Sequence, residues 1–278
     1  MAERAGRVEG KAAIVTGAGS TPGPGVGTGK AIAIALAREG ASVLLVDLYP
    51  ERAEETRAII EAEGGKAQVF GGDVTRSADC AAMVAEAVSA FGTVDILVNN
   101  IGRATVGTVV DTTEEAWDQA LAINLRTVFL ACKHTVPVMI ANGGGAILNV
   151  NSISALRGDG TIAYSAAKGG MLAMTTDMAY SHGRDGIRVN AVAPGHITTP
   201  MVLSVPGQGD DMVTRLRNEA SLLGTPGTGW DVASAAVFLT SDDARWITGV
   251  TLPVDAGVLS VTPLLMAGRL RGVSDEKS

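Results

Sequence analysis

Residues 12–36 have the sequence AAIVTGAGSTPGPGVGTGKAIAIAL, from Ala12 to Leu36. The first five residues form the short apolar run of a buried strand, the glycines after them predict a tight turn, and the part from Gly29 onward has the composition of a helix. Free backbone N–H groups and the helix dipole favour an anion at such a helix N-terminus, and glycine lets a phosphate approach closely. The segment therefore predicts a phosphate-binding strand–turn–helix unit.

The same alternation of short apolar runs and helical patterns continues along the chain. Strands are predicted at 12–16, 42–47, 67–70, 94–99, 146–151, 188–193 and 250–254, and helices at 29–39, 51–63, 78–91, 113–132, 162–181, 210–223 and 231–239. The runs near 43–46 and 95–98 do not alternate between apolar and polar residues, which is typical of strands covered by helices on both faces. The sequence therefore predicts an α/β fold with one Rossmann-type, doubly wound sheet of seven mainly parallel strands.

The length of 278 residues fits one large domain. We expect an N-terminal tail at 1–10, a Rossmann-fold domain at 11–258 and a C-terminal extension at 259–278. The region 198–229 is rich in Pro and Gly, and long excursions of this kind are often lids or binding loops. Residues 200–225 are therefore predicted to form a substrate-binding loop and helix.

Composition and charge argue against several classes of protein. A net charge of −7 without a local Lys/Arg run gives no general attraction to nucleic acid or to an anionic membrane. The charged start and the lack of about 18 consecutive apolar residues predict a cytoplasmic protein with no membrane segment. Cys80 and Cys132, in alanine-rich helical stretches, are predicted to be buried free thiols. His134, His182 and His196 have no metal-ligand spacing, so no metal site is predicted.

Tyr164 and Lys168 are four residues apart, just downstream of Ser152. On a helix, residues at this spacing share a face, so the phenol and the ammonium reach the same small molecule. A free phenol has a pKa of about 10, and a neighbouring cation favours the phenolate, which brings the group closer to useful acid/base chemistry. The same spacing also occurs by chance in exposed helices, so the pair alone does not define a catalytic site.

Polar residues follow the predicted strands at their carboxyl ends, where doubly wound sheets bind ligands. Asp47 closes the second strand 18 residues beyond Gly29, where a carboxylate accepts hydrogen bonds from adenosine ribose hydroxyls. It would repel a 2′-phosphate, and no Arg or Lys follows before Arg52, so the sequence favours NAD over NADP. Asp73-Val74 and 99–102 lie at the same edge and fit either turn chemistry or adenine contact.

These motifs together resemble the short-chain dehydrogenase/reductase family, in its Tyr-x-x-x-Lys branch. The matching segments follow the family's order over nearly the whole chain: the glycine loop, Gly72-Asp73-Val74, Asn99-Asn100-Ile101-Gly102, Ile123-Asn124-Leu125, Ser152, Tyr164-x-x-x-Lys168, Pro194-Gly195-His196-Ile197-Thr198-Thr199, Ile247-Thr248-Gly249 and Val254-Asp255-Ala256-Gly257. The resemblance implies a Rossmann-type oxidoreductase that uses a nicotinamide dinucleotide.

The chain departs from the family pattern in its glycine loop. About six extra residues, Thr21–Val26, enlarge the loop relative to the usual Thr-Gly-x-x-x-Gly-x-Gly. Pro22 and Pro24 restrict this insertion. It fits either an ordered flap near the pyrophosphate or adenosine side, or a tolerated surface insertion.

A second departure concerns the serine. Ser152 precedes Tyr164 by 12 residues, where 13 is common in the family, and Ser154 is the competing candidate. Ser152 follows its strand directly, which favours it. An expanded glycine loop also occurs in related enoyl reductases, but those separate the active tyrosine and lysine by six residues instead of three. The spacing from Tyr164 to Lys168 therefore favours carbonyl/alcohol chemistry over C=C reduction.

By this resemblance, Tyr164 is the general acid/base, Lys168 lowers its pKa and binds the nicotinamide ribose, and Ser152 holds the substrate oxygen. Asn124 is expected to join a buried water relay to Lys168, or to make only a local hydrogen bond. The backbone of Ile197 and the side chain of Thr199 are expected to engage the carboxamide. The expected cofactor-binding residues are Gly17, Ser20, Gly27, Thr28, Asp47, Leu48, Asp73, Val74, Asn100, Ile101, Gly102, Tyr164, Lys168, Pro194, Gly195, Ile197 and Thr199.

The function that follows is NAD-dependent interconversion of a secondary alcohol and a ketone. The alternatives are an enoyl reductase or epimerase on the same fold, and a non-catalytic dinucleotide-binding protein. Apolar residues in the segment from Met201 to Leu223 favour an apolar or cyclic substrate, whereas Arg103 and Arg157 fit a carboxylate. Family habit implies a homotetramer, which apolar residues in the segment 258–265 would help to form.

Overall fold

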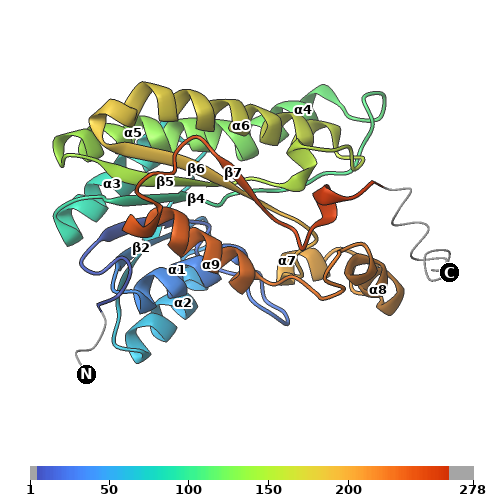
Figure 1. The fold of residues 1–278 in the computed structure, drawn as a ribbon, viewed down its shortest axis with the longest axis horizontal. Coiled ribbons are helices and arrows are strands. Elements are labelled where there is room, and N and C mark those ends of the chain that lie inside the picture. Colours follow the sequence, from blue (N-terminus) through green and yellow to red (C-terminus); the bar gives the residue numbers. More distant parts are fainter. Residues whose placement is uncertain (1–4, 263–278) are drawn as a thin grey trace, which may run out of the picture.

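Residues 5–262 are the part of the chain that the computed structural model describes. Within them, seven parallel strands form one sheet in the order β3-β2-β1-β4-β5-β6-β7 (Figure 1). The strands are β1 Ala12–Thr16, β2 Ser42–Asp47, β3 Lys66–Gly71, β4 Ile96–Asn99, β5 Gly145–Val150, β6 Ile187–Pro194 and β7 Thr251–Val254. The predicted doubly wound sheet is confirmed. Its order reverses between β1 and β4, which places a ligand crevice at their carboxyl ends.

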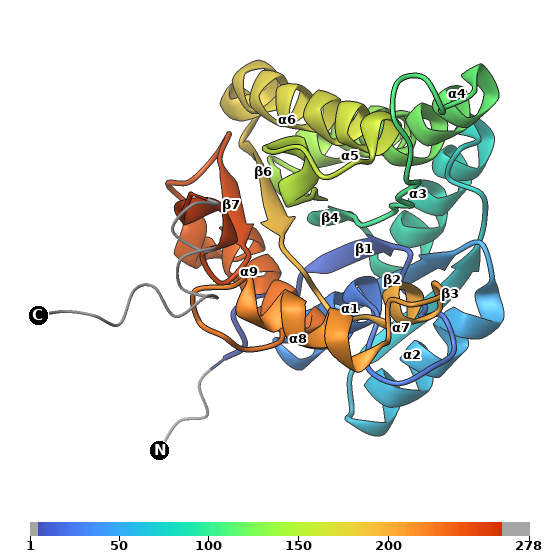
Figure 2. The same ribbon diagram turned by 90° about the vertical axis from the view of Figure 1, so that its right-hand side faces the viewer.

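Helices cover both faces of the sheet (Figures 1 and 2). Helices α1, α2 and α9 lie against one face, and α3, α5 and α6 lie against the other. Their bounds are α1 Thr28–Arg38, α2 Pro50–Ala62, α3 Ser77–Phe91, α4 Glu114–Leu121, α5 Thr127–Ala141, α6 Ile162–His182, α7 Pro200–Leu203, α8 Asp211–Glu219 and α9 Gly229–Thr240. The short helices α7 and α8 lie beyond one edge of the sheet, on the right of Figure 1.

The two hydrophobic cores follow from the pleat of the strands, because successive side chains point to opposite faces. Val15 and Leu45 belong to the core on the α1 face, whereas Ile14 and Leu44 belong to the core on the α3 face, and all four are fully buried. Fully burying such a side chain stabilises the fold by about 1.5–3 kcal/mol. The strands that are continuously apolar in the sequence are therefore strands with both faces buried under helices.

Part of the segment expected as an N-terminal tail is packed against the domain. Val8 is 2% exposed and belongs to the core on the α1 face. Its backbone N–H donates to the Glu39 carbonyl at 3.1 Å, and the backbone N–H of Arg7 donates to the Glu39 carboxylate at 2.8 Å. The described tail residues thus hold the end of α1. Most of the predicted C-terminal extension, from residue 263, lies outside the described residues.

The region predicted as one helix over 113–132 is divided. Helix α4 passes into a π-helical segment, Ala122–Arg126, before α5 begins and continues to Ala141. The sequence also predicts a capping box of Thr112 and Glu115 at the start of this helix, which is wrong: Thr113 accepts the N-cap hydrogen bond, from the N–H of Ala116 at 3.2 Å. Thr112 instead donates its hydroxyl to a carbonyl in the preceding loop at 2.8 Å. Likewise, the helix predicted over 210–223 is the shorter α8.

Both cysteines are free and buried, as predicted. Burial raises the pKa of the Cys80 thiol to about 11 and that of the Cys132 thiol to about 12. Thiols of this kind remain protonated at neutral pH and are poor nucleophiles. Their role is therefore to fill the core between α3, α5 and the sheet.

Candidate active site

The predicted site residues meet at the carboxyl edge of the sheet, because the strands are parallel and each motif follows the end of a strand. Figure 2 looks onto this edge, where the loops after β1, β4 and β6 emerge from the sheet and α7 and α8 lie beside them. The cofactor motifs follow β1, β2, β3, β4 and β6, and the catalytic motifs follow β5 and lie on α6.

The glycine loop and the start of α1 pack too closely for any side chain at Gly29. A β-carbon on Gly29 would lie 2.0 Å from the carbonyl oxygen of Gly17, which itself has φ +64°. Helix α1 begins at Thr28 with no acidic residue in its first turn. Its N–H groups and dipole therefore suit a phosphate.

The residues predicted as an insertion form a loop closed at its base by Ser20, whose hydroxyl accepts the N–H of Gly27 at 3.2 Å. The loop extends toward the start of α7. β-carbons placed on Gly23 and Gly25 would lie 3.5 Å and 3.9 Å from atoms of the Pro200 ring. Figures 1 and 2 both place this loop beside α7. The loop thus lies close to the first residue of the segment predicted to bind substrate.

Asp47 ends β2, at the position where the sequence predicts contact with the adenosine ribose. One carboxylate oxygen accepts the N–H of Gly19 at 2.9 Å, and the other accepts the N–H of Tyr49 at 3.0 Å. Each oxygen keeps a lone pair for a further donor. Next to it, the Arg52 guanidinium stacks over the Tyr49 ring at 4.1 Å from its centroid. Leu48, also predicted to contact the cofactor, is exposed on this rim.

Asn100 joins the loop after β4 to the glycine loop. Its backbone N–H donates to the Thr16 hydroxyl at 3.0 Å, and its side-chain amide donates to the carbonyls of Thr16 and Gly17 at 3.2 Å each. Ile101 would contact a β-carbon on Gly17 at 3.0 Å. These contacts fix the floor of the crevice at the point where the strand order reverses.

Asp73 and Val74 occupy the loop after β3. The Asp73 carboxylate accepts both the hydroxyl and the N–H of Thr75, at 2.7 and 2.9 Å, and the hydroxyl bond in particular lowers the pKa of Asp73. Val74 is 6% exposed and packs in the core. This geometry fits the turn chemistry left open by the sequence.

Lys168 is the most deeply buried charged residue of the site, at 1% exposure. Its ammonium donates to the Val150 carbonyl at 2.8 Å and lies 5.6 Å from the centroid of the Tyr164 ring. Burial lowers the pKa of Lys168 to about 7. The helical spacing thus brings the lysine and the tyrosine to one face of α6, as predicted.

The Tyr164 side chain is half-buried, beside the Ser152 hydroxyl. Burial raises the pKa of Tyr164, the bond from Ser152 lowers it, and the charge of Asp159 raises it further. The effect of Lys168 on the Tyr164 phenol stays a prediction. A bound oxidised nicotinamide would add positive charge to this site.

Asn124 is fully buried within the π-helical segment. Its side chain accepts the N–H of Arg103 at 2.8 Å and donates to the carbonyls of Arg103 and Ala120 at 3.1 and 2.9 Å. A β-carbon on Gly102 would lie 3.4 Å from the Lys168 ammonium nitrogen and 3.5 Å from the Asn124 amide oxygen. Asn124 therefore anchors the loop that lies between it and Lys168, and such π segments are frequent at functional sites.

Ser152 caps a short 3-10 turn, Ile153–Ala155, and accepts the N–H of Ser154 at 3.2 Å. Its hydroxyl donates to the Ser154 hydroxyl at 3.1 Å, which in turn donates to the Asp159 carboxylate. The sequence reasoning did not identify Asp159. The sequence feature that could have identified it is its position between two glycines, Gly158 and Gly160, in the loop that precedes the predicted catalytic tyrosine.

The loop after β6 brings the last predicted residues to the crevice. Gly195 packs against Asp255, since a β-carbon there would lie 2.7 Å from the Cβ of Asp255. Ile197 pairs with Gly227 in an isolated bridge, and the Thr199 hydroxyl caps α7 by accepting the N–H of Val202 at 3.3 Å. A cavity of about 320 Å³ lies between this loop, α8 and the end of β7, and His196 and Arg217 are among its lining residues.

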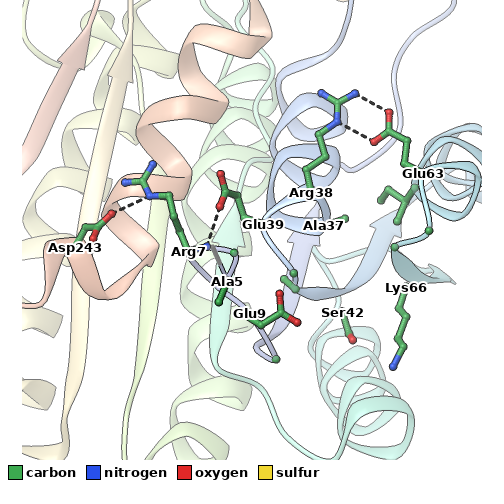
Figure 3. Close-up of a pocket in the computed structure, with 17 residues that line it drawn as sticks. Ala5, Arg7, Glu9, Ala37, Arg38, Glu39, Ser42, Glu63, Lys66 and Asp243 are labelled. Atoms are coloured by element: carbon green, nitrogen blue, oxygen red, sulfur yellow. Dashed lines mark hydrogen bonds and ion pairs between the residues drawn. The ribbon is translucent and has the colours of Figure 1, made fainter. Parts of the chain in front are cut away.

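A larger cavity, of about 990 Å³, lies at the opposite edge of the sheet (Figure 3). Two of its arginines are paired: Arg7 bonds Asp243 at 2.8 Å, and Arg38 bonds Glu63 at 2.7 Å. The amino ends of parallel strands carry no ligand site in doubly wound sheets. The candidate active site is therefore the carboxyl edge of the sheet, where Ser152, Tyr164 and Lys168 lie.

Among residues 5–262, no group of three or more His, Cys, Asp or Glu side chains has an arrangement suited to a metal ion. Over the same residues, no helix combines the length and the apolar character needed to cross a membrane.

A glycine-lined phosphate crevice next to a buried lysine, tyrosine and serine defines a dinucleotide-dependent oxidoreductase. Residues 25–259 match the family model described as "Enoyl-(Acyl carrier protein) reductase". A solved structure from Burkholderia xenovorans, assigned to the short-chain dehydrogenases/reductases, is 42% identical, covers 93% of this chain and 100% of its own, and has a TM-score of 0.87. The chain belongs to the short-chain dehydrogenase/reductase family, whose members use a nicotinamide dinucleotide.

Two further relatives carry a named activity. The 2-(S)-hydroxypropyl-CoM dehydrogenase 3 of Xanthobacter autotrophicus (strain ATCC BAA-1158 / Py2) is 39% identical over 81% of this chain and 89% of its own. A 7α-hydroxysteroid dehydrogenase, solved with NADH and 7-oxo glycochenodeoxycholic acid, is 33% identical, covers 90% of this chain and 95% of its own, and has a TM-score of 0.84. Both names describe the oxidation of a hydroxyl group.

Proposed function

We propose that this protein is an NAD-dependent oxidoreductase that interconverts a secondary alcohol and a ketone, with Tyr164 as general acid/base. The nicotinamide supplies or accepts the hydride when it is bound. During reduction the Tyr164 phenol gives its proton to the substrate oxygen, and during oxidation the phenolate removes a proton from the hydroxyl. Ser152 holds the same oxygen, and Lys168 holds the cofactor ribose.

The observation that carries this proposal is the position of Tyr164 beside the Ser152 hydroxyl and the buried Lys168. These groups converge where a reacting oxygen would contact both hydroxyls. The geometry supports proton transfer to oxygen, which carbonyl reduction requires.

Replacement of Tyr164 by Phe tests the mechanism. Tyr164→Phe should leave NADH binding intact and lower kcat by about a hundredfold to ten-thousandfold, since proton transfer is lost. Tyr180→Phe is the matched control, because Tyr180 lies on the same helix and is 87% exposed. Turnover by Tyr164→Phe at the rate of the control would refute the role of the tyrosine.

The preference for NAD rests on Asp47. Its carboxylate faces the expected ribose position and would repel a 2′-phosphate. Arg52 is the first cation after Asp47 in the sequence that could attract a 2′-phosphate, but its guanidinium stacks on the Tyr49 ring. NADH should therefore bind more tightly than NADPH in a fluorescence titration, and Asp47→Asn should narrow the difference. Tighter binding of NADPH by the unaltered protein would refute the proposal.

An apolar or cyclic secondary alcohol is the substrate class that we favour. Met201, Val202 and Leu203 form α7 beside the crevice, and Met201 is 50% exposed. The steroid named in the 7α-hydroxysteroid dehydrogenase structure is a cyclic substrate of a relative. A screen of NAD reduction across secondary alcohols, cyclic diols, sugars and hydroxy acids tests this proposal, and turnover confined to hydroxy acids would contradict it.

Reduction of a C=C bond is the second candidate, because the matched family model is described as an enoyl reductase. Three residues between Tyr164 and Lys168 favour the carbonyl reaction instead. Assaying NADH oxidation with an enoyl thioester and with a ketone separates the two. A protein that binds NADH but turns over neither would be the non-catalytic alternative.

We also propose a homotetramer, from the habit of the family. Exposed aromatic residues support it: Phe129 on α5 is 51% exposed, and Trp246, before β7, is 90% exposed. Large exposed apolar side chains of this kind often mark contacts with other chains. Sedimentation equilibrium measures the assembly, and a monomer at micromolar concentration would contradict it.

A further inference from the structure

The loop Thr21–Val26 has a sequence that restricts it to one path. Two prolines alternate with two glycines in Pro22-Gly23-Pro24-Gly25. Each proline holds its own φ at about −65° and limits the conformations open to the chain. Gly23 and Gly25 have φ of +139° and +93°, values that residues with a side chain rarely adopt. The loop therefore has a defined shape and is not a flexible linker.

The base and the second half of the loop are fixed to the domain core. The Ser20 hydroxyl accepts the N–H of Gly27 at 3.2 Å, which closes the base. Val26 packs against the core on the α1 face. A β-carbon on Gly229, the first residue of α9, would lie 3.1 Å from the carbonyl oxygen of Val26. The loop is thus anchored next to α1 and α9.

The exposed tip of the loop lies close to the start of α7, as Figures 1 and 2 show. Pro200, the first residue of α7, is buried, whereas the next residue, Met201, is 50% exposed. β-carbons on Gly23 and Gly25 would lie 3.5 Å and 3.9 Å from carbon atoms of the Pro200 ring. These are ordinary van der Waals separations, so the tip helps to cover the proline through apolar packing.

The segment that follows Pro200 has little packing of its own. None of the residues 201–220 is buried. The segment is attached near its two ends, where the N–H of Thr198 donates to the Gly227 carbonyl at 2.9 Å and the N–H of Leu222 donates to the Ala256 carbonyl at 2.8 Å. A segment with so few buried contacts depends on its attachments for its position. The packing around Pro200 therefore determines how α7 leaves the sheet.

We propose that the loop Thr21–Val26 is a positioning element of the substrate site, which packs on Pro200 and fixes the start of α7. The kinetic part of this inference rests on the proposed function. Thr199, which caps α7 and is expected to engage the nicotinamide carboxamide, directly precedes Pro200. Of the two interpretations that the sequence leaves open, the loop is thus the ordered flap, and its tip serves the substrate side.

Deletion of Pro22–Gly25 tests the inference. Ser20 and Gly27 are within hydrogen-bond distance, so the chain can close between them as a two-residue turn that leaves the phosphate-binding glycines in place. The KM for a bulky cyclic alcohol should rise by about threefold to tenfold, because the substrate must then order the segment as it binds. The kcat and the Kd for NADH should each stay within about twofold.

A second variant keeps the length of the loop. Pro22→Ser combined with Pro24→Ser releases the fixed φ angles and should raise KM in the same direction by a smaller factor. This variant decides the question if the deletion variant does not fold. An unchanged KM in an active deletion variant, or in the double serine variant where the deletion does not fold, would overturn the inference.

Pro200→Gly removes the ring on the other side of the same packing. If the loop acts through Pro200, the combined variant should raise KM by clearly less than the product of the two separate effects. Pro206→Gly is the matched control, since Pro206 is an exposed proline of the same segment, and its effect should multiply with that of the deletion. Full multiplication with Pro200→Gly as well would overturn the inference.

Hydrogen exchange gives a readout that needs no substrate. Peptides from 201–220 should exchange at least about threefold faster in the deletion variant, and peptides from the sheet should be unchanged. Unchanged exchange in 201–220 would overturn the inference, and so would weaker NADH binding at unchanged KM, which would assign the loop to the cofactor site. Failure of the proposed function is distinguishable, because the unaltered protein would then oxidise no alcohol and the exchange measurement alone would decide the role of the loop.

Discussion

The two sides of the crevice are built differently. Helix α1, on the cofactor side, buries seven of its residues, whereas α8, on the substrate side, buries none. Strand β1 beside α1 is buried throughout. The chemistry common to the family is thus attached to a rigid framework, and the part expected to select the substrate is attached to a surface segment. Changes in the two regions should therefore have different consequences for stability and for activity.

Gly29→Val should have the largest effect on stability and on NADH binding, since it disrupts the packing of the framework itself. The new β-carbon would lie 2.0 Å from the Gly17 carbonyl oxygen, so α1 and the phosphate loop must separate. We expect NADH binding to be lost and the free energy of unfolding to fall by about 3 kcal/mol. Fluorescence titration and urea unfolding measure both quantities. Gly169→Ala is the control, because nothing lies within 4 Å of a β-carbon there; its stability should not fall.

Lys168→Met sharpens the comparison by testing a charge buried in the framework. The pKa of Lys168 is about 7 in the folded protein, below its value of 10.5 in the unfolded chain. Between these values the unfolded state binds the extra proton, so stability rises with pH, and below about pH 7 the full cost of burying the charge is present. Between about pH 7 and pH 9.5, the free energy of unfolding of the unaltered protein should rise by on the order of 3 kcal/mol more than that of the variant. Urea unfolding at several pH values measures this difference, and the same change with pH in both proteins would contradict the prediction.

Thr228→Ala tests a local feature of the framework. The Thr228 hydroxyl and the Asp231 carboxylate form a capping box at the start of α9, which packs on the same core as α1. Loss of the cap should lower the free energy of unfolding by about 1 kcal/mol and leave KM unchanged. Thermal unfolding and steady-state kinetics check the two parts, and a changed KM would mean that the framework and the substrate side are coupled here.

Leu216→Ala should have the smallest effect on stability. Leu216 lies on α8 and is 50% exposed, so the free energy of unfolding should change by no more than about 0.5 kcal/mol. The KM for a bulky cyclic alcohol should still rise by about threefold to tenfold if α8 contacts the substrate. A large loss of stability with no change in KM would reverse the proposed contrast between the two sides.

The framework could be predicted because its signals are local. The bounds of β1 and β2 match the predicted 12–16 and 42–47, since a strand with two buried faces is continuously apolar. Tyr164 and Lys168 share a face because helical periodicity requires it. The strand order and the placement of the motifs at one edge could be predicted from the parallel connections and from the family resemblance. Secondary-structure propensity alone does not predict them.

The features that were missed depend on contacts distant in sequence or on hydrogen-bond direction. The burial of Val8 requires the end of α1, and the π-helical segment around Asn124 carries no propensity signal of its own. Asp159 lies in a glycine-flanked turn, where composition predicts flexibility but not the side chain's orientation. The position of the N-cap at Thr113 rather than Thr112 is a one-residue error typical of helix ends.

The proximity of Gly23 and Gly25 to Pro200 has a consequence for protein engineering. The loop predicted to be enlarged relative to the family lies close to the first residue of the segment expected to choose the substrate. A chimera that imports residues 200–225 from a relative with a short glycine loop would place a foreign surface against this loop. To exchange substrate preference between family members, both segments should therefore be transplanted as a matched pair.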